Sequence, residues 1–230
     1  MNNYSAKELL KHFTLFKGLS DSEMEPIVDF SHNRLYRRGT HIFMHGDPLT
    51  NVYFIYQGKI KIYKTDLHGK EQIVNVLEAG DMFPHLGFFR KGDYPAHAQV
   101  IEDAVLLYIP IESFENFLLT HPETSVKLLR VLGDRIVDLQ SRLEEQILHN
   151  TYEQIILLLL RLAKNNGTEL DGGDVKITTQ FTNRELANMI GSSRETVSRT
   201  LTQLKKKNLL STDKSGYFLI DTEALEDELF

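Results

Sequence analysis

The chain has 230 residues, of which 41% are hydrophobic and 25% are charged, and its formal net charge is −6. This length suits one large or two small domains with a buried core. The absence of cysteine excludes disulfides, thiolate–zinc sites, cysteine-ligated iron–sulfur clusters and a cysteine nucleophile.

Two features of the apolar residues predict a cytoplasmic protein without a membrane segment. The first residues, MNNYSAKELLKHF, lack the apolar core of a secretory signal. The most apolar run, residues 155–160, is far too short to span a bilayer.

The first part of the chain is predicted to contain short helices followed by a β domain. Residues 4–32 have near-helical apolar spacing, and Ser20 with Glu23 has the spacing of a capping box that begins a helix. Short β-rich runs follow at residues 41–44, 52–56, 59–63, 72–77 and 104–109. Glycine-containing turns separate them at residues 45–48, 57–58, 68–69, 79–81 and 91–93. This even spacing predicts an antiparallel sandwich or barrel, with Phe83, Phe88 and Phe89 in its core.

Beyond Pro110 the pattern becomes helical. Residues 111–120 suit a short helix, and Pro122 suits the first turn of the next one. In that next helix five apolar residues alternate three and four apart, as in the a/d seam of a coiled coil. They are Leu129, Leu132, Ile136, Leu139 and Leu143. We interpret this segment as a dimerisation helix; the alternative is a helix packed on its own domain, because core helices also carry apolar stripes.

The C-terminal part begins after a joint and contains the basic block of the chain. Thr151 is predicted to cap a helix over residues 152–164, and residues 164–174 form a polar, glycine-rich loop. Residues 1–175 carry 18 Lys+Arg and 24 Asp+Glu, residues 176–217 carry 8 and 3, and residues 218–230 carry 0 and 5. The net charges of these segments are therefore −6, +5 and −5. The basic block indicates a surface for a polyanion, although charge alone also suits a solvated face.

Two capped helices around a glycine lie inside the basic block, in residues 182–211. Thr182 with Glu185 and Ser192 with Glu195 have capping-box spacing, so each pair is expected to begin a helix. Gly191 between the helices suits a sharp turn. Six apolar residues are expected to face inward: Leu186, Ala187 and Ile190 in the first helix, and Val197, Leu201 and Leu204 in the second.

The outward positions of the second helix include two arginines and a glutamate. Arg194, Glu195, Ser198 and Arg199 are expected to project outward, as in the inserted helix of a helix-turn-helix. Arginine suits guanine O6 and N7, and glutamate accepts a hydrogen bond from cytosine N4. Residues 209–220 are predicted to form a hairpin wing that turns at residues 214–216. A purely structural helix pair explains the caps but not these outward residues, so DNA binding is favoured.

These motifs resemble the Crp–Fnr family of bacterial transcription regulators over nearly the whole chain. SSRETVSRTL is similar to the family's recognition helix, and RRGTHIFMHGDPLTNVYFIYQGKIKIY to the start of its β-roll. The resemblance implies an α+β fold in three parts. These are a cyclic-nucleotide-binding-type β-roll (a double-stranded β-helix or jelly roll) in residues 1–110, a short helix and long dimerisation helix in residues 111–150, and a winged helix-turn-helix in residues 151–230.

The same resemblance implies the partners and the contact residues. The chain would be a homodimer that binds a palindromic DNA operator and contacts RNA polymerase, and it would not be an enzyme. Arg194, Glu195 and Arg199 match base-reading positions, and Ser198 is similar to the anaerobic-regulator branch. The positions near DNA phosphates are Thr182, Asn183, Arg184, Ser192, Ser193 and Thr196. A TGTGA-like half-site is expected, with a TTGAT-like core as second choice.

The effector site departs from the family pattern. Where cyclic-AMP receptors have Glu, Arg and Ser for the ribose and the cyclic phosphate, this chain has His85, Tyr94 and Pro95. The phosphate would lose its charged partner, and proline lacks an N–H. Two adenine-contacting positions would be Leu139 and Gln140. Cyclic-AMP dependence is therefore not expected, and we predict no cofactor, because the cysteines that ligate the cluster of the oxygen-sensing branch are absent as well.

Three alternatives remain open. His41, His45 and His85 raise the possibility of a haem-sensing or small-molecule-sensing regulator of the same fold. A cupin-type metal enzyme shares the double-sheet barrel, but the HxH-type ligand pair is absent. A nucleotide-binding regulatory subunit is disfavoured by the altered cassette.

Overall fold

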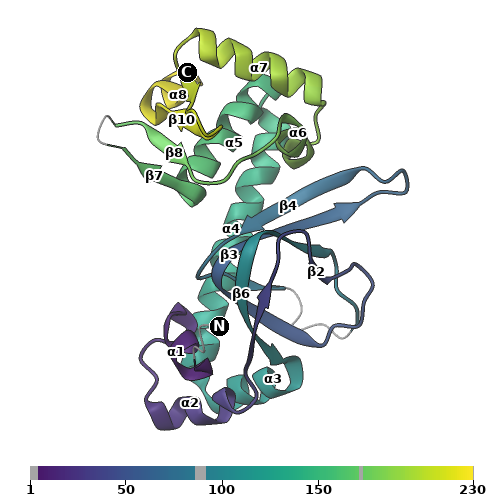
Figure 1. Ribbon diagram of the computed structural model, residues 1–230, viewed down its shortest axis with the longest axis vertical. Helices are drawn as coiled ribbons and strands as arrows, with labels where there is room; N and C mark the ends of the chain where they lie inside the picture. The colour runs from purple at the N-terminus through teal and green to yellow at the C-terminus, as the bar shows by residue number, and fades with distance from the viewer. Residues whose placement is uncertain (1–4, 86–91, 171–172, 230) are drawn as a thin grey trace. The chain divides into compact units, whose positions relative to one another are not determined.

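Residues 5–85, 92–170 and 173–229 are described by a computed structural model, shown in Figure 1. The chain divides into two units, Met1–Ile136 and Val137–Phe230. The long helix α4 (Pro122–Leu148) begins in the first unit and ends in the second. The predicted start of this helix at Pro122 is confirmed, as is the short helix α3 (Ile111–Thr120) before it.

The first unit contains the predicted β-roll. Its strands are β1 (His32–Tyr36), β2 (His41–Phe43), β3 (Asn51–Thr65), β4 (Glu71–Leu77), β5 (Met82–Phe83) and β6 (His97–Pro110). They form one antiparallel sheet in the order β1-β6-β3-β4, with β2 also on β6 and β5 also on β3. The long strands β3 and β6 pair with each other, and each takes two further partners along its length, which lets one sheet curl on itself.

The sequence-based strand assignment is wrong at residues 57–58. The predicted turn is instead part of the continuous 15-residue strand β3, and the pairing with β6 shifts register on both sides of Gln57. Gly58 has φ +90° there, and a Cβ at this position would lie 2.4 Å from the Asp103 carbonyl oxygen. Glycine thus permits a bulge that needs both an unusual backbone angle and a close backbone approach.

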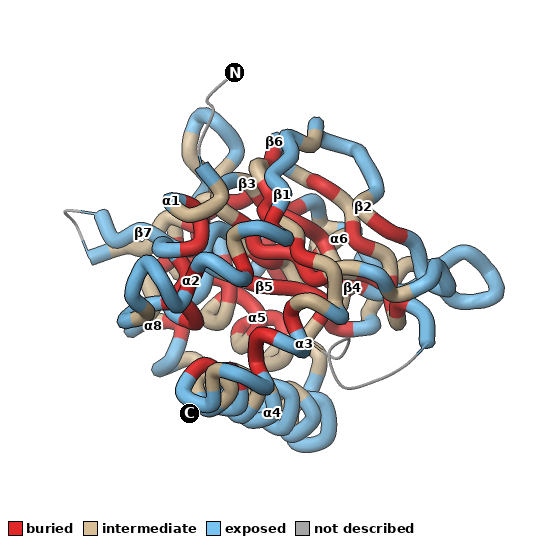
Figure 2. Tube along the Cα trace, turned by 90° about the horizontal axis from the view of Figure 1, so that it is seen from below, coloured by how far each residue is buried: buried red, intermediate tan, exposed pale blue. Residues whose placement is uncertain are grey.

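Alternate residues of β3 and β6 enter two separate cores, as the two-residue period of a strand requires. Phe54 and Leu107 face a cluster built with α1 (Ala6–Lys11), η1 (Thr14–Phe16), α2 (Asp21–Val28), α3 and α4. Tyr53 and Leu106 face a second cluster inside the roll, together with Phe83. Phe88 and Phe89 lie outside the described residues. In Figure 2 buried residues lie on strands of the roll and on the short helices packed against it.

The apolar stripe predicted on α4 is exposed to solvent at four of its five residues. Leu129, Ile136, Leu139 and Leu143 are each 57–61% exposed. Leu132, in contrast, is partly buried against the core of the first unit. For this residue the alternative interpretation, a helix packed on its own domain, is therefore the correct one. Much of α4 is accordingly coloured as exposed in Figure 2.

The second unit combines helices with a small antiparallel sheet. It contains α5 (Thr151–Asn166), α6 (Asn183–Ile190), α7 (Arg194–Lys206) and α8 (Thr222–Asp227). The sheet order is β7-β8-β10-β9, formed by β7 (Gly167–Glu169), β8 (Val175–Ile177), β9 (Leu210–Thr212) and β10 (Phe218–Ile220). Three of these elements are not predicted from the sequence pattern: β7, which lies in the predicted loop, β8 and α8.

The cap of α5 was also assigned one residue too late. Asn150, not Thr151, is the N-cap, because its side chain accepts from the N–H groups of Tyr152 and Glu153. Glu153 completes a capping box by accepting from the Asn150 N–H at 3.1 Å. Asparagine at the cap followed by Glu three residues later is a signal that the sequence did contain.

Candidate nucleic-acid interface

The first helix of the predicted helix-turn-helix is α6, and its limits follow from its caps. The Thr182 hydroxyl accepts from the Glu185 N–H at 3.2 Å, and the Glu185 carboxylate accepts from the Thr182 N–H at 2.8 Å. This capping box confirms the predicted start. Gly191, with φ +72°, ends the helix in the left-handed conformation that favours glycine.

The second helix, α7, begins one residue later than the sequence suggests. Its N-cap is Ser193, whose hydroxyl accepts from the Thr196 N–H at 3.0 Å. Ser192 still belongs to the turn, because its N–H donates to the Ala187 carbonyl at 3.0 Å. The predicted capping box of Ser192 with Glu195 is therefore wrong. Glu195 is exposed within the first turn of α7 rather than engaged as a cap.

Burial separates the two faces of these helices as predicted. All six expected core residues are buried: Leu186, Ala187, Ile190, Val197, Leu201 and Leu204. Arg194, Glu195 and Arg199 are exposed, and Ser198 is half-buried one turn from Arg194. Within the described part of the chain, no ion pair involves Arg194 or Arg199. These two guanidinium groups are thus placed to meet an external partner.

The expected phosphate-contacting residues gather at the N-terminal ends of α6 and α7. Thr182, Arg184 and Ser193 are exposed, whereas Asn183, Ser192 and Thr196 are half-buried. The N-terminal N–H groups of a helix favour anions, since they lack partners within the helix. The structure therefore brings these six residues to ends that suit phosphate groups.

The predicted hairpin of the wing is confirmed by the pairing of β9 with β10, and it contains Asp213, which the sequence pattern does not single out. The Asp213 carboxylate accepts from the N–H groups of Ser215 and Tyr217, at 2.8 and 2.9 Å, and from Lys176 Nζ at 2.6 Å. Contacts from Lys176 and from these N–H groups lower the pKa of Asp213 below its usual value. Lys214 is left exposed at the tip. The sequence does contain a signal for this turn, because an Asp side chain often accepts a hydrogen bond from the backbone N–H two residues later.

Tyr94, one of the three residues predicted to form the altered effector site, packs among aromatic side chains inside the β-roll. Tyr94 is 2% exposed, and its ring stacks on Phe43 with centroids 3.7 Å apart. Its hydroxyl accepts from the Asn51 N–H and donates to the Asn51 carbonyl, both at 3.1 Å. Pro95 beside it is half-buried. The phenol of Tyr94 therefore has its hydrogen bonds satisfied by the protein itself.

His85 is half-buried, and its Nε2 is inaccessible to solvent and has no hydrogen-bond partner among the described residues. Burial, and secondarily the charge of Arg135, lowers the pKa of His85 to about 4. The other histidines considered above lie elsewhere: His41 Nε2 is 2.9 Å from the Tyr63 hydroxyl, and the His45 ring is 6.1 Å from that of His97. In the described ranges, no group of three or more His, Asp or Glu is placed to hold a metal.

Two family models match the two parts of the chain described above. Residues 33–121 match the cyclic nucleotide-binding domain, and residues 153–228 match the Crp-like helix-turn-helix domain. The chain belongs to the Crp–Fnr family. Its members are DNA-binding transcription regulators, so the family, fold-class and transcription-regulation predictions are confirmed.

Curated relatives align over nearly the full chain. A CRP-like cAMP-activated global transcriptional regulator of Mycobacterium tuberculosis is 27% identical over 218 residues, which cover 95% of this chain and 97% of that protein. A global nitrogen regulator of Synechocystis is 28% identical over 93% of each chain. The anaerobic regulatory protein of Bacillus subtilis is 27% identical over 88% of this chain and 85% of its own.

Solved structures show the same fold. A mutant of CooA from Carboxydothermus hydrogenoformans has a TM-score of 0.75 at 21% identity, covering 100% of this chain and 98% of its own. The c-di-GMP-responsive regulator CLP of Xanthomonas campestris has a TM-score of 0.74 at 20% identity, covering 87% and 99%. Among the described residues, no helix is long and apolar enough to cross a membrane.

Proposed function

We propose that this Crp–Fnr regulator acts as a homodimer that inserts α7 of each subunit into the major groove of a palindromic operator. The observation that supports this most directly is the first two turns of α7, where Arg194, Glu195 and Arg199 are exposed. A helix-turn-helix presents these N-terminal turns to base edges, and a two-fold dimer presents them twice. Bound at a promoter, such a dimer would be positioned to contact RNA polymerase.

We assign base reading and phosphate contact to different residues according to where their side chains lie. Arg194, Glu195, Ser198 and Arg199 would read bases. The six residues at the N-terminal ends of α6 and α7 would meet the flanking phosphates, which fix the register of the protein on DNA without reading sequence. They are Thr182, Asn183, Arg184, Ser192, Ser193 and Thr196.

Selection of bound sequences from random duplex DNA tests this function. We expect recovery of an inverted repeat of TGTGA, or of a TTGAT-like core as second choice, with half-site centres about 34 Å apart. Repeating the selection in the presence of cell extract would show whether an effector is needed. Recovery of sequences with no common element under either condition would contradict the proposal.

We further propose that cyclic AMP is not the signal. The support is local: Tyr94 stands where the cyclic phosphate would need a cationic partner, and it is buried, stacked and hydrogen-bonded by Asn51. Relatives differ in the signals that their names give, since one is described as cAMP-activated and a structural neighbour as c-di-GMP-responsive. Calorimetric titration is expected to detect no cyclic-AMP binding at micromolar concentration and no change in DNA affinity. Micromolar binding would contradict this part of the proposal.

A further inference from the structure

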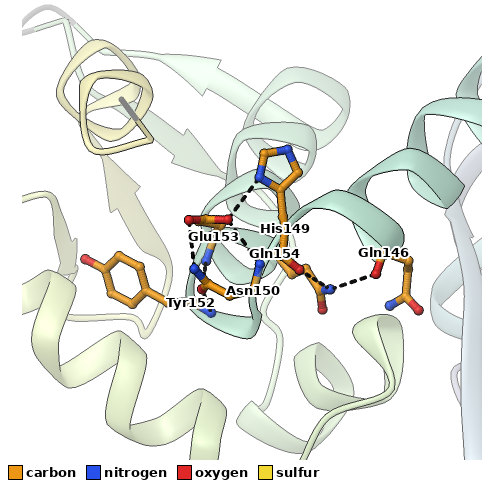
Figure 3. A network of polar contacts seen from close by, with 6 residues as sticks. All are labelled: Gln146, His149, Asn150, Tyr152, Glu153 and Gln154. Atoms are coloured by element: carbon orange, nitrogen blue, oxygen red, sulfur yellow. Dashed lines mark hydrogen bonds and ion pairs between the residues drawn. The ribbon is translucent and has the colours of Figure 1, made fainter.

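The end of α4 is joined to the helix-turn-helix by side-chain amides. Only His149 and Asn150 separate α4 from α5. Gln154 Nε2 donates to the His149 carbonyl at 2.9 Å and lies 3.5 Å from the Gln146 carbonyl, as Figure 3 shows. The carbonyl of Gln146 in the last turn of α4, and that of His149 just beyond the helix, are thus bound by a side chain in the first turn of α5.

The carboxylate of Glu153 binds the two residues that connect α4 to α5. Glu153 accepts from the Asn150 N–H at 3.1 Å and from Asn150 Nδ2 at 2.7 Å, and it lies 3.0 Å from His149 Nδ1 (Figure 3). One turn before the end of α4, Glu145 accepts two hydrogen bonds from Arg161 on α5, at 2.5 and 2.7 Å. These contacts fix the direction in which α5 leaves α4.

Gln146 connects α4 directly to the recognition elements. Its Nε2 donates at 3.0 Å to the carbonyl of Ile190, the last residue of α6. Gly191 and Ser192 follow, and Ser193 then caps α7. The amide of Gln146 therefore holds the point from which the turn to α7 begins, although Gln146 is itself exposed and lies far along the chain from the DNA-reading residues.

We infer that Gln146 is a positioning residue that sets which half-site spacing the dimer accepts; this rests on the proposed function. Moving a half-site by one base pair displaces it by about 3.4 Å along the DNA axis and about 34° around it. If the recognition helix is held at a fixed angle to the dimer helix, the dimer fits one half-site spacing. It then binds more weakly to DNA whose half-sites are one base pair closer together or farther apart. Without the bond from Gln146, α6 and α7 are freer to follow the shifted groove.

The test uses Gln146→Met, which keeps the length of the side chain but removes its donor. Binding is measured on inverted repeats of the selected half-site at spacings from two base pairs shorter to two longer than the preferred one. The wild type is expected to prefer one spacing. In the variant, the affinity ratio between the best spacing and its neighbours should shrink by about two- to tenfold, the range expected for one hydrogen bond. The preference for the half-site sequence should stay unchanged.

Two controls separate the possible failures. Glu144→Gln changes an exposed residue of the same helix, two positions away, and should leave the spacing profile unaltered. Gln146→Glu also removes the donor and should act like Gln146→Met. If both Gln146 variants lose affinity equally at all spacings, or keep the wild-type profile, Gln146 does not set the spacing. If the wild type itself binds an inverted repeat no better than a single half-site, the proposed dimeric function fails instead.

Discussion

Arg199 and Arg184 are both exposed arginines in the helix-turn-helix, yet they occupy different places in it. Arg199 lies in the second turn of α7, whereas Arg184 lies in the first turn of α6. A residue that pairs with a guanine edge discriminates between sequences, and one that meets a phosphate does not. The two positions therefore allow base reading and phosphate contact to be separated by substitution.

Arg199→Ala should cost roughly 1–3 kcal/mol per half-site on the cognate duplex and relax preference at one base pair. Arg184→Ala should weaken binding to cognate and scrambled duplexes alike and lower the salt slope by about one unit. Binding isotherms on both duplexes at several salt concentrations distinguish the two effects. An equal loss on both duplexes for Arg199→Ala would mean that Arg199 does not read a base.

The half-buried His85, whose Nε2 is inaccessible to solvent, predicts an acid sensitivity of the first unit. Its pKa is lowered to about 4 in the folded chain from an ordinary value of 6.5, chiefly by burial. In the unfolded chain His85 therefore binds a proton below about pH 6.5, whereas in the folded chain it binds one only near pH 4. Stability is lost as the pH falls through this window, by up to about 3 kcal/mol.

Replacing His85 by Asn removes this proton and should flatten that part of the stability profile. The measurement is the free energy of unfolding in denaturant at pH values between 4 and 7.5, for wild type and His85→Asn. Carboxylates that titrate in the same range contribute equally to both proteins, so the difference between the two curves isolates the imidazole. Parallel curves would show that His85 is protonated in the fold as readily as in the unfolded chain.

At the scale of the elements, strand β3 depends on Gly58. Alanine there would have to adopt φ near +90°, and its Cβ would come within 2.4 Å of the Asp103 carbonyl oxygen and 2.6 Å of Ala104 Cα. The backbone angle alone costs about 1–2 kcal/mol, and forcing the atoms apart adds about 1–3 kcal/mol. Gly58→Ala should therefore destabilise the protein by roughly 2–5 kcal/mol.

Gly46 provides a matched control for that substitution. Its φ is +88°, nearly the same, but nothing lies within 4 Å of an added Cβ. Gly46→Ala should cost only the backbone part, about 1–2 kcal/mol. Chemical denaturation of both variants measures the difference. If the two alanines cost the same, the close approach of β6 to β3 at the bulge is not tight.

The comparison with the sequence shows which elements local patterns can specify. The capping boxes at Ser20 and Thr182 were predictable because cap and carboxylate are three residues apart in one segment. The start of α7 was not, because two serines are adjacent and the choice between them depends on the hydrogen bond from Ser192 to Ala187 in the preceding helix. The sequence around Gly58 predicts a turn, because the close neighbour that leaves no room for a side chain there, the Asp103 carbonyl, is distant in sequence.

The site was predictable to a similar degree. The inward and outward faces of α7 follow from helical periodicity, and the structure has them as expected. The stacking of Tyr94 on Phe43 and the bond from Gln146 to Ile190 join segments 51 and 44 positions apart, and no local pattern encodes such pairs. Leu132 was placed in the seam because spacing alone does not show which side of a helix meets its own core.

At the scale of the whole molecule, the exposed side of α4 is the feature that a single chain leaves unexplained. Five of the exposed apolar residues of α4 lie along one stripe, at intervals of three, seven, seven and four: Val126, Leu129, Ile136, Leu143 and Ile147. This is a heptad stripe, and soluble monomers rarely expose such a continuous apolar surface. With Leu132 turned toward its own core, the centre of the stripe passes through Ile136, and Leu139 lies at its flank.

A charge at the centre of the stripe should therefore separate the proposed dimer more strongly than one at its edge. Ile136→Lys places an ammonium group from each subunit in the seam and should raise the dimer dissociation constant by at least about tenfold, since an unpaired buried charge is costly. Leu139→Lys should act in the same direction but less, because a lysine at the flank can extend to water. Leu119→Lys, at an 80% exposed position on α3, should leave association unchanged. Sedimentation of the wild type and the three variants at micromolar concentration ranks these effects. If Ile136→Lys sediments as the wild type does, the stripe on α4 is not the surface through which two chains associate.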